Sequence, residues 1–220
     1  MSISLTSFGQ TDVGLKRQKN EDSYLIDESL GLFVVADGMG GHKGGDMASS
    51  MAVAAMQEIM SIGLGKQAQN FSPREAMHAG YTRASQSIYH KSHVDNPELE
   101  GMGTTLVSAL FYENRFYFGN VGDSRAYLIR DGKMWQLTED PSLLNEHIRA
   151  GLIRDTDAEQ FQAKNVITRS VGFEKEVICD VLEKIVQPGD RYMMCSDGLC
   201  GLVTPDELLN LCLVKNLQES

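Results

Sequence analysis

The feature that most constrains the fold is an apolar run that stops at a single aspartate. Residues 31–36 (GLFVVA) have the length and valine content of a buried β-strand. The run is followed at once by Asp37-Gly38 and a glycine-dense segment ending at Asp46, which predicts a tight turn. Residues 47–62 contain neither glycine nor proline, and they are rich in alanine, serine and methionine. They predict a helix that packs closely on a sheet through its small side chains.

Helix and strand signals follow in blocks. A second helix should start where Ser72 caps it, Pro73 takes the first position and Glu75 completes a capping box, and it should run to about residue 90. Thr204 should cap a last helix, and a polar helix is expected at 142–162. The predicted strands are 24–26, 31–36, the hairpin 104–121, the hairpin 125–137 with a type I′ turn, 177–186 and 191–195. Helices grouped between antiparallel strands predict a single α+β domain over residues 1–220.

Composition excludes several classes of protein. The 220 residues carry a formal net charge of −10, which argues against nucleic-acid binding because the phosphate backbone attracts positive charge. No apolar run approaches the roughly 20 residues that span a bilayer, and no secretory signal is recognisable. The cysteines form no C-x-x-C pair, so we expect buried thiols in a reducing, cytoplasmic setting; they are Cys179, Cys195, Cys200 and Cys212.

Acidic residues recur beside the predicted strands. Glu21 and Asp22 precede the first strand, whereas Asp37, Asp123 and Asp197 follow later ones. Mg²⁺ and Mn²⁺ prefer carboxylate and carbonyl oxygens together with water, and glycine lets the backbone turn beside an ion. Each Asp-Gly pair alone is more typical of a plain turn. Three such corners in one acidic chain nevertheless favour a hard-metal site.

Two other phosphate chemistries do not fit the sequence. The glycine-dense segment lacks the dinucleotide fingerprint, which would require glycine at Lys43, and it lacks Walker A spacing. The cysteine-phosphatase loop C-x₅-R is also absent, because Gly201 and Asp206 stand six positions after Cys195 and Cys200. The glycine-dense segment is better interpreted as a metal corner that leads into a helix.

Six motifs occur in order along the chain. They are 17–22 (RQKNED), 34–41 (VVADGMGG), 103–105 (GTT), 119–125 (GNVGDSR), 167–172 (ITRSVG) and 195–199 (CSDGL). Together they closely resemble the bacterial branch of the metal-dependent PP2C-type (PPM) protein phosphatases. The likeness extends from about residue 10 to residue 208.

The resemblance implies a four-layer α-β-β-α sandwich with two central antiparallel sheets and two Mn²⁺ or Mg²⁺ ions at one edge. By it, Asp37 would bridge both ions, the Gly38 carbonyl would bind one and Asp197 the other. Asp123 would contribute to a third, weaker site. Glu21 and Asp22 would hold metal-bound waters, and Arg17 would bind the substrate phosphate, for which a guanidinium is well shaped.

Two departures from the family pattern concern His42 and the end of the chain. Eukaryotic relatives have Gly-His after the bridging aspartate, where this chain has Met39. His42 could protonate the leaving group, or it could be a solvated loop histidine with solvent as the acid. Family members close with an Asp-Asn pair followed by a final strand. The present sequence stops at Ser220 without this pair. We therefore expect a truncated form; the alternative is a protein without that ligand.

The resemblance implies a phosphoserine and phosphothreonine phosphatase whose substrates are products of a Ser/Thr kinase. Alternatives are a non-catalytic binding module of the same fold and a hydrolase of small phosphate esters. We expect a monomer with no nucleic-acid or membrane partner. Residues 143–164 match the family's variable flap, and they are either a lid over the site or a solvated surface helix.

Overall fold

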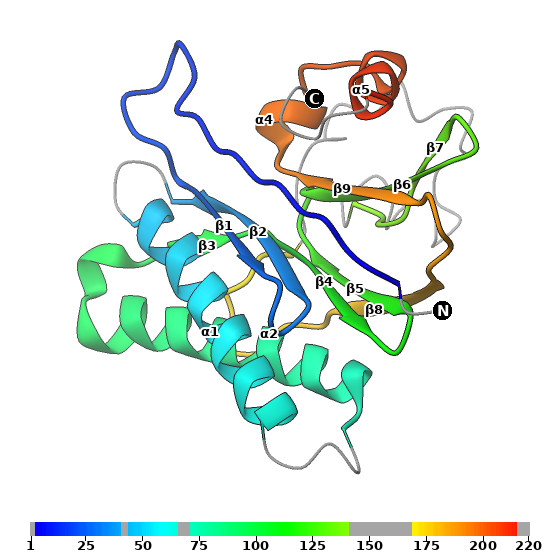
Figure 1. Ribbon diagram of the computed structural model, residues 1–220. Helices are drawn as coiled ribbons and strands as arrows, with labels where there is room; N and C mark the ends of the chain where they lie inside the picture. Colours follow the sequence, from blue (N-terminus) through cyan, green and yellow to red (C-terminus); the bar gives the residue numbers. More distant parts are fainter. Residues whose placement is uncertain (1–2, 41–43, 66–70, 141–168, 215–220) are drawn as a thin grey trace, which may run out of the picture.

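The computed structural model describes residues 3–40, 44–65, 71–140 and 169–214. Three predictions lie outside these residues: the helix at 142–162, the lid at 143–164 and the role of His42. The described part of the chain forms two antiparallel sheets with helices on both outer sides (Figure 1).

The larger sheet has six strands. Its order is β1-β2-β4-β5-β8, with β3 paired to β2. The strands are β1 (Asp22–Asp27), β2 (Leu32–Met39), β3 (Gly103–Thr104), β4 (Leu106–Tyr112), β5 (Arg115–Val121) and β8 (Asp180–Ile185). The smaller sheet has the order β7-β6-β9 and consists of β6 (Arg125–Arg130), β7 (Lys133–Gln136) and β9 (Arg191–Cys195).

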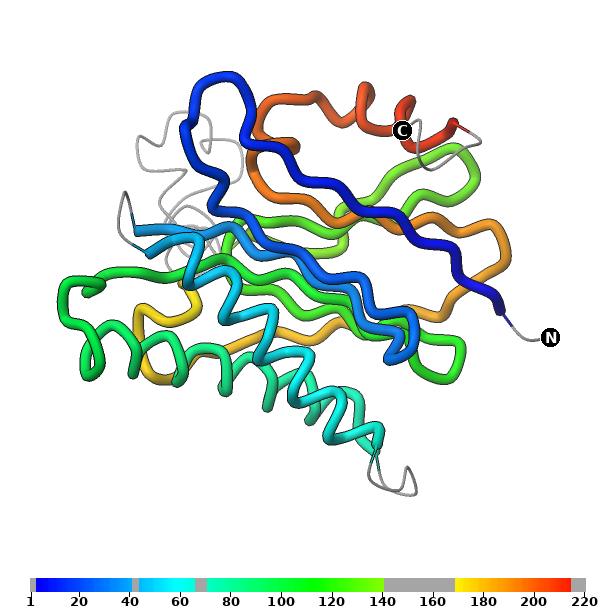
Figure 2. The backbone as a smooth tube through the Cα atoms, turned by 60° about the vertical axis from the view of Figure 1, so that its left-hand side comes forward, coloured from blue at the N-terminus to red at the C-terminus, as the bar shows by residue number. Residues whose placement is uncertain are grey.

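Helices complete the layers. The long helices α1 (Gly45–Gly65) and α2 (Pro73–His90) cover the outer face of the larger sheet, and α2 is followed by a π-turn (Lys91–Asp95) and a 3₁₀ turn (Pro97–Leu99). The shorter α4 (Asp197–Cys200) and α5 (Pro205–Cys212) lie beyond the smaller sheet. Figure 2 shows the two sheets stacked between these helices. This arrangement confirms the α+β sandwich predicted from the sequence.

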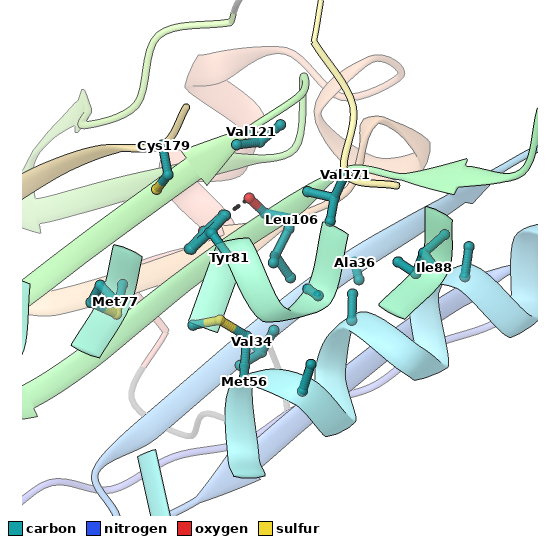
Figure 3. Close-up of a cluster of buried hydrophobic side chains, with 14 of the residues drawn as sticks. Val34, Ala36, Met56, Met77, Tyr81, Ile88, Leu106, Val121, Val171 and Cys179 are labelled. Carbon is teal, nitrogen blue, oxygen red and sulfur yellow. Dashed lines mark hydrogen bonds between the residues drawn. The ribbon is translucent and has the colours of Figure 1, made fainter. Parts of the chain in front are cut away.

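Two hydrophobic layers hold the sandwich together. Between α1, α2 and the larger sheet, Tyr81 is fully buried, and its hydroxyl donates to the Leu106 carbonyl at 3.1 Å (Figure 3). Between the sheets, the ring of Phe116 on β5 meets that of Tyr192 on β9 edge-on, with centroids 4.8 Å apart. Such aromatic pairs add stability beyond the area they bury, so they help to fix one sheet against the other.

Local signals placed the helix starts and hairpin turns correctly. Ser72 accepts a hydrogen bond from the Glu75 amide, but among the described hydrogen bonds the Glu75 side chain does not return one, so the predicted capping box is only half formed. Thr204 forms a reciprocal capping box with Glu207. The two-residue turn at Glu113 and Asn114 has φ angles of 50° and 60°, and the Asp131-Gly132 turn has 50° and 70°. Both turns are left-handed, as a type I′ hairpin requires.

Three expectations need correction. The strand predicted at 31–36 continues through Asp37-Gly38 to Met39, because β1 and β3 supply hydrogen-bonding partners for those residues. The hairpin strand predicted from residue 104 is divided, with Thr105 lying between β3 and β4. The thiols of Cys179 and Cys195 are buried as expected, whereas Cys200 and Cys212 are only half-buried.

Helix α1 is also more apolar than expected. The helix has 21 residues, and an 18-residue stretch of it reaches a mean hydropathy of 1.2, so by length and composition alone it could cross a membrane. One such helix is weak evidence, because the core helix of a soluble protein passes the same test. In this fold the fully buried Ala48, Ala52, Met56 and Met60 belong to the hydrophobic layer against the larger sheet.

Candidate metal centre

The acidic residues of the larger sheet meet at one edge because of strand register. Asp22 on β1 lies directly opposite Asp37 on β2. One residue further on, the Gly38 amide donates to the Glu21 carbonyl at 3.1 Å. Like charges directly opposite each other destabilise a sheet, so this pairing needs a compensating partner.

Asp123 and Asp197 reach the same edge from the smaller sheet. Asp123 lies in the turn by which the chain leaves β5 and enters β6 in the other sheet. Asp197 is the first residue of α4, directly after β9 and the N-cap Ser196. Ser196 is buried and donates a hydrogen bond of 2.8 Å to Asp22 Oδ2, which ties the end of β9 to β1.

Electrostatics confirm that these side chains converge. The pKa of Asp37 rises from 3.8 to about 8, first because burial disfavours its charge and then because of the nearby charge of Asp22. A hydrogen bond to Asp197 and the charges of Asp197 and Asp123 add to the effect. The pKa of Asp123 is also raised, by burial and by Asp197. Asp37 therefore lies at the centre of a group of four carboxyl groups, gathered from four separate parts of the chain.

The chemistry of this donor set fits divalent cations. In the part of the chain that the structure describes, no three His, Cys, Asp or Glu side chains could enclose a single ion. The pair Asp37 and Asp197, with the carbonyl of Gly38, would leave the remaining coordination positions to water. Mg²⁺ keeps several waters in this way and is bound through one or two carboxylates. A cation would also offset the charge repulsion that raises the pKa of Asp37.

Gly38 is required by close packing beside the carboxylates. A Cβ atom at this position would lie 2.0 Å from the Gly45 carbonyl oxygen, at the start of α1, and 2.7 Å from the Glu21 carbonyl oxygen. Both obstacles are backbone, so neither can rotate away.

We expect Gly38→Ala to shift β2 away from α1. The predicted loss of stability is about 2–4 kcal/mol, since overpacking against backbone costs more than overpacking against flexible side chains. Gly65→Ala is the matched control, because a Cβ atom added at Gly65 would have no atom within 4 Å and Gly65 has no positive φ. Chemical denaturation would measure both. Equal effects for the two variants would show that the close approach to Gly45 is unimportant.

Arg17 lies at the rim of the group. Its side chain is 70% exposed, and its guanidinium is 3.8 Å from Glu21 Oε2. It is therefore near the acidic edge yet open to solvent, as expected of a group that binds an incoming anion. The structure brings together the five predicted acidic residues and one glycine: Glu21, Asp22, Asp37, Asp123 and Asp197, with Gly38.

Sequence reasoning missed the hydroxyl groups that hold these acids. Ser196 contacts Asp22, and Thr105 contacts the backbone of Asp37 and the side chain of Ser124. All three lie inside the motifs CSDGL, GTT and GNVGDSR, next to an acid or a turn. The motif positions were therefore the available signal, although they do not show which hydroxyl meets which acid.

Comparison with known proteins identifies the family of this chain. Residues 15–213 match the family model described as Protein phosphatase 2C, and the chain belongs to this family. It is 36% identical over 208 residues to the serine/threonine phosphatase stp of Listeria innocua, covering 90% of this chain and 79% of that protein. It is 34% identical over 221 residues to the serine/threonine protein phosphatase PstP of Mycobacterium tuberculosis, covering all of this chain and 41% of the larger PstP.

Solved structures give the same result. The catalytic domain of the serine/threonine protein phosphatase PstP, in complex with two manganese ions, superposes with a TM-score of 0.80 at 32% identity. That match covers 96% of this chain and 85% of the PstP domain. A crystal structure of a bacterial serine phosphatase gives a TM-score of 0.81 at 32% identity, covering 94% and 84%. These relatives confirm the resemblance and the protein serine/threonine phosphatase class predicted from the motifs.

Proposed function

We propose that this protein removes phosphate from phosphoserine and phosphothreonine in proteins, with two Mn²⁺ or Mg²⁺ ions held at the acidic edge. The single observation that carries the proposal is the position of the half-buried Asp37 among the carboxyl groups of Asp22, Asp123 and Asp197. Asp37, the Gly38 carbonyl and Asp197 are the proposed ligands of the two ions. Asp123 contributes to a third, weaker site. The manganese pair reported for the PstP domain supports this assignment.

Bound divalent cations would lower the pKa of a water molecule and offset charge on the phosphoryl oxygens. The chain's own residues do the rest. Glu21 and Asp22 accept hydrogen bonds from waters at the edge, and the Ser196 hydroxyl fixes the orientation of the Asp22 carboxylate. Arg17 binds the phosphate as it enters, because its guanidinium is exposed and a planar fork matches phosphate geometry.

Phosphoproteins made by a Ser/Thr kinase are the proposed substrates. A monomer in the cytoplasm is the proposed state; the free thiols of Cys179, Cys195, Cys200 and Cys212 suit a reducing compartment. The acidic net charge of −10 is the reason for proposing no nucleic-acid partner.

A substrate comparison tests the proposal. We expect hydrolysis of a phosphothreonine peptide in the presence of Mn²⁺, no hydrolysis after chelation, and a kcat/KM at least about tenfold lower for a sugar phosphate. The reason is that the exposed edge beside Arg17 can accept an extended chain, whereas a small ester loses those contacts. Phosphate release would measure all three reactions. Binding of the peptide without turnover would favour a non-catalytic module instead, and a preference for the sugar phosphate would favour a small-ester hydrolase.

A further inference from the structure

Thr105 forms hydrogen bonds with both backbone polar groups of Asp37, its N–H and its carbonyl. The Asp37 amide donates to Thr105 Oγ1 at 3.0 Å, and the Thr105 amide donates to the Asp37 carbonyl at 2.9 Å. Thr105 is 1% exposed. An unpaired buried amide costs about 1–3 kcal/mol, so the hydroxyl of Thr105 is a specific requirement at this position.

The same residue also holds the turn that carries Asp123. Its Oγ1 lies 2.7 Å from Ser124 Oγ, and Ser124 is fully buried. On the other side of Asp123, Gly122 packs so closely on Thr105 that an added Cβ would lie 2.7 Å from Thr105 Cβ. Thr105 thus contacts both neighbours of Asp123 and both backbone polar groups of Asp37.

We propose that Thr105 is a positioning residue that sets the spacing between Asp37 and Asp123, with Ser124 as its partner. This inference rests on the proposed function, since the two aspartates are the groups that would bind the cations. The ladder between β4 and β5 begins only at the pair Leu106 and Val121, so it does not include Thr105 or the Asp123 turn. The hydroxyl contacts of Thr105 therefore fix the position of the Asp123 turn relative to Asp37, which the hydrogen bonds between β4 and β5 do not.

The consequence is an effect on metal affinity. Removing a group that orients a metal ligand without touching the ion typically lowers the affinity for the metal about 10–100-fold. Thr105→Val keeps the shape of the side chain but removes the hydroxyl, which frees the Asp37 amide and releases Ser124. We expect Mn²⁺ to bind this variant about 10–100-fold more weakly than the original protein. Thr105→Ser keeps the hydroxyl and should bind Mn²⁺ with nearly the original affinity.

Isothermal titration of the chelator-treated 220-residue chain with Mn²⁺ tests the proposal, because it measures binding without turnover. Ser108→Ala is the matched control. Ser108 is a fully buried hydroxyl residue on β4, and it bonds Tyr81 at 3.0 Å, within the layer between the sheet and α2. Thermal melting should show that Ser108→Ala is destabilised, whereas its Mn²⁺ affinity should stay unchanged.

Three results would overturn the inference. They are an unchanged Mn²⁺ affinity in Thr105→Val, an equal loss of affinity in Ser108→Ala, and a failure of Thr105→Ser to restore binding. If Thr105→Val does not fold, Ser124→Ala decides, because it leaves the acceptor of the Asp37 amide in place; weaker Mn²⁺ binding supports the inference and unchanged binding overturns it. Absence of Mn²⁺ binding by the unmodified chain would instead reject the proposed function, and this inference with it.

Discussion

Replacing Asp37 by asparagine is expected to reduce Mn²⁺-dependent phosphopeptide hydrolysis by at least about a thousandfold. Asp37 is the central member of the acidic group, and its loss would remove the proposed bridge between two ions. A metal ion contributes several kcal/mol to stabilising a transition state, and about 1.4 kcal/mol corresponds to a factor of ten in rate. Steady-state phosphate release at saturating Mn²⁺ would measure the loss.

Asp131→Asn is the matched control for this experiment. Asp131 also precedes a glycine, but it lies in the turn between β6 and β7 with a φ of 50°, a conformation that asparagine accepts readily. Its replacement should leave the rate within about twofold of the original, because surface changes of this kind have small effects. Substantial activity in Asp37→Asn, or an equal loss in Asp131→Asn, would reject the assignment of Asp37.

The sequence was most informative where local chemistry decides the structure. The cap residues Ser72 and Thr204 mark true helix starts, because their side chains satisfy amides of the first turn. The Asp131-Gly132 turn is predictable for a similar reason, since its left-handed backbone favours these two residue types. Each of these features depends on residues within four positions of one another.

Contacts between distant parts of the chain were less predictable. Asp37-Gly38 suggested a turn because this dipeptide is common there, yet pairing with β1 and β3 keeps it in the strand. The bond from the Asp37 amide to Thr105 spans 68 positions, and the contact between Thr105 and Ser124 spans 19. Such bonds depend on strand register, and nothing local in the sequence sets the register between β2 and β4.

The sequence predicted which residues form the acidic edge, but it did not predict how they are arranged in space. Their places beside predicted strands pointed to all five acids, and the motif resemblance implied their roles; they are Glu21, Asp22, Asp37, Asp123 and Asp197. Which two acids lie opposite each other follows only from the pairing of β1 with β2. This pairing places Asp22 against Asp37, and it brings uncompensated charge into the fold. The site therefore has a cost in stability that only a bound cation or a proton can relieve.

That cost leads to the second large expected effect, on the stability of the metal-free protein. Folded Asp37 keeps its proton up to about pH 8, whereas the unfolded carboxyl loses it near 3.8. Between these values the folded state binds more protons than the unfolded state, so the free energy of unfolding should fall as the pH rises. The total fall in the free energy of unfolding should be a few kcal/mol, since each unit of difference between the folded and unfolded pKa of Asp37 corresponds to about 1.4 kcal/mol.

Asp37→Asn should remove most of this pH dependence, because asparagine carries no titrating proton. In chelator, the variant should be more stable than the original chain at pH 8 by a few kcal/mol, and the two should converge near pH 4. Added Mn²⁺ should reverse the order at pH 8, since a ligand that binds only the folded state stabilises it and the variant lacks the central carboxylate. Asp131→Asn should follow the original chain throughout. Urea denaturation from pH 4 to 8 would measure these differences, and parallel curves for the original chain and Asp37→Asn would show that Asp37 is not held at high pKa by its acidic neighbours.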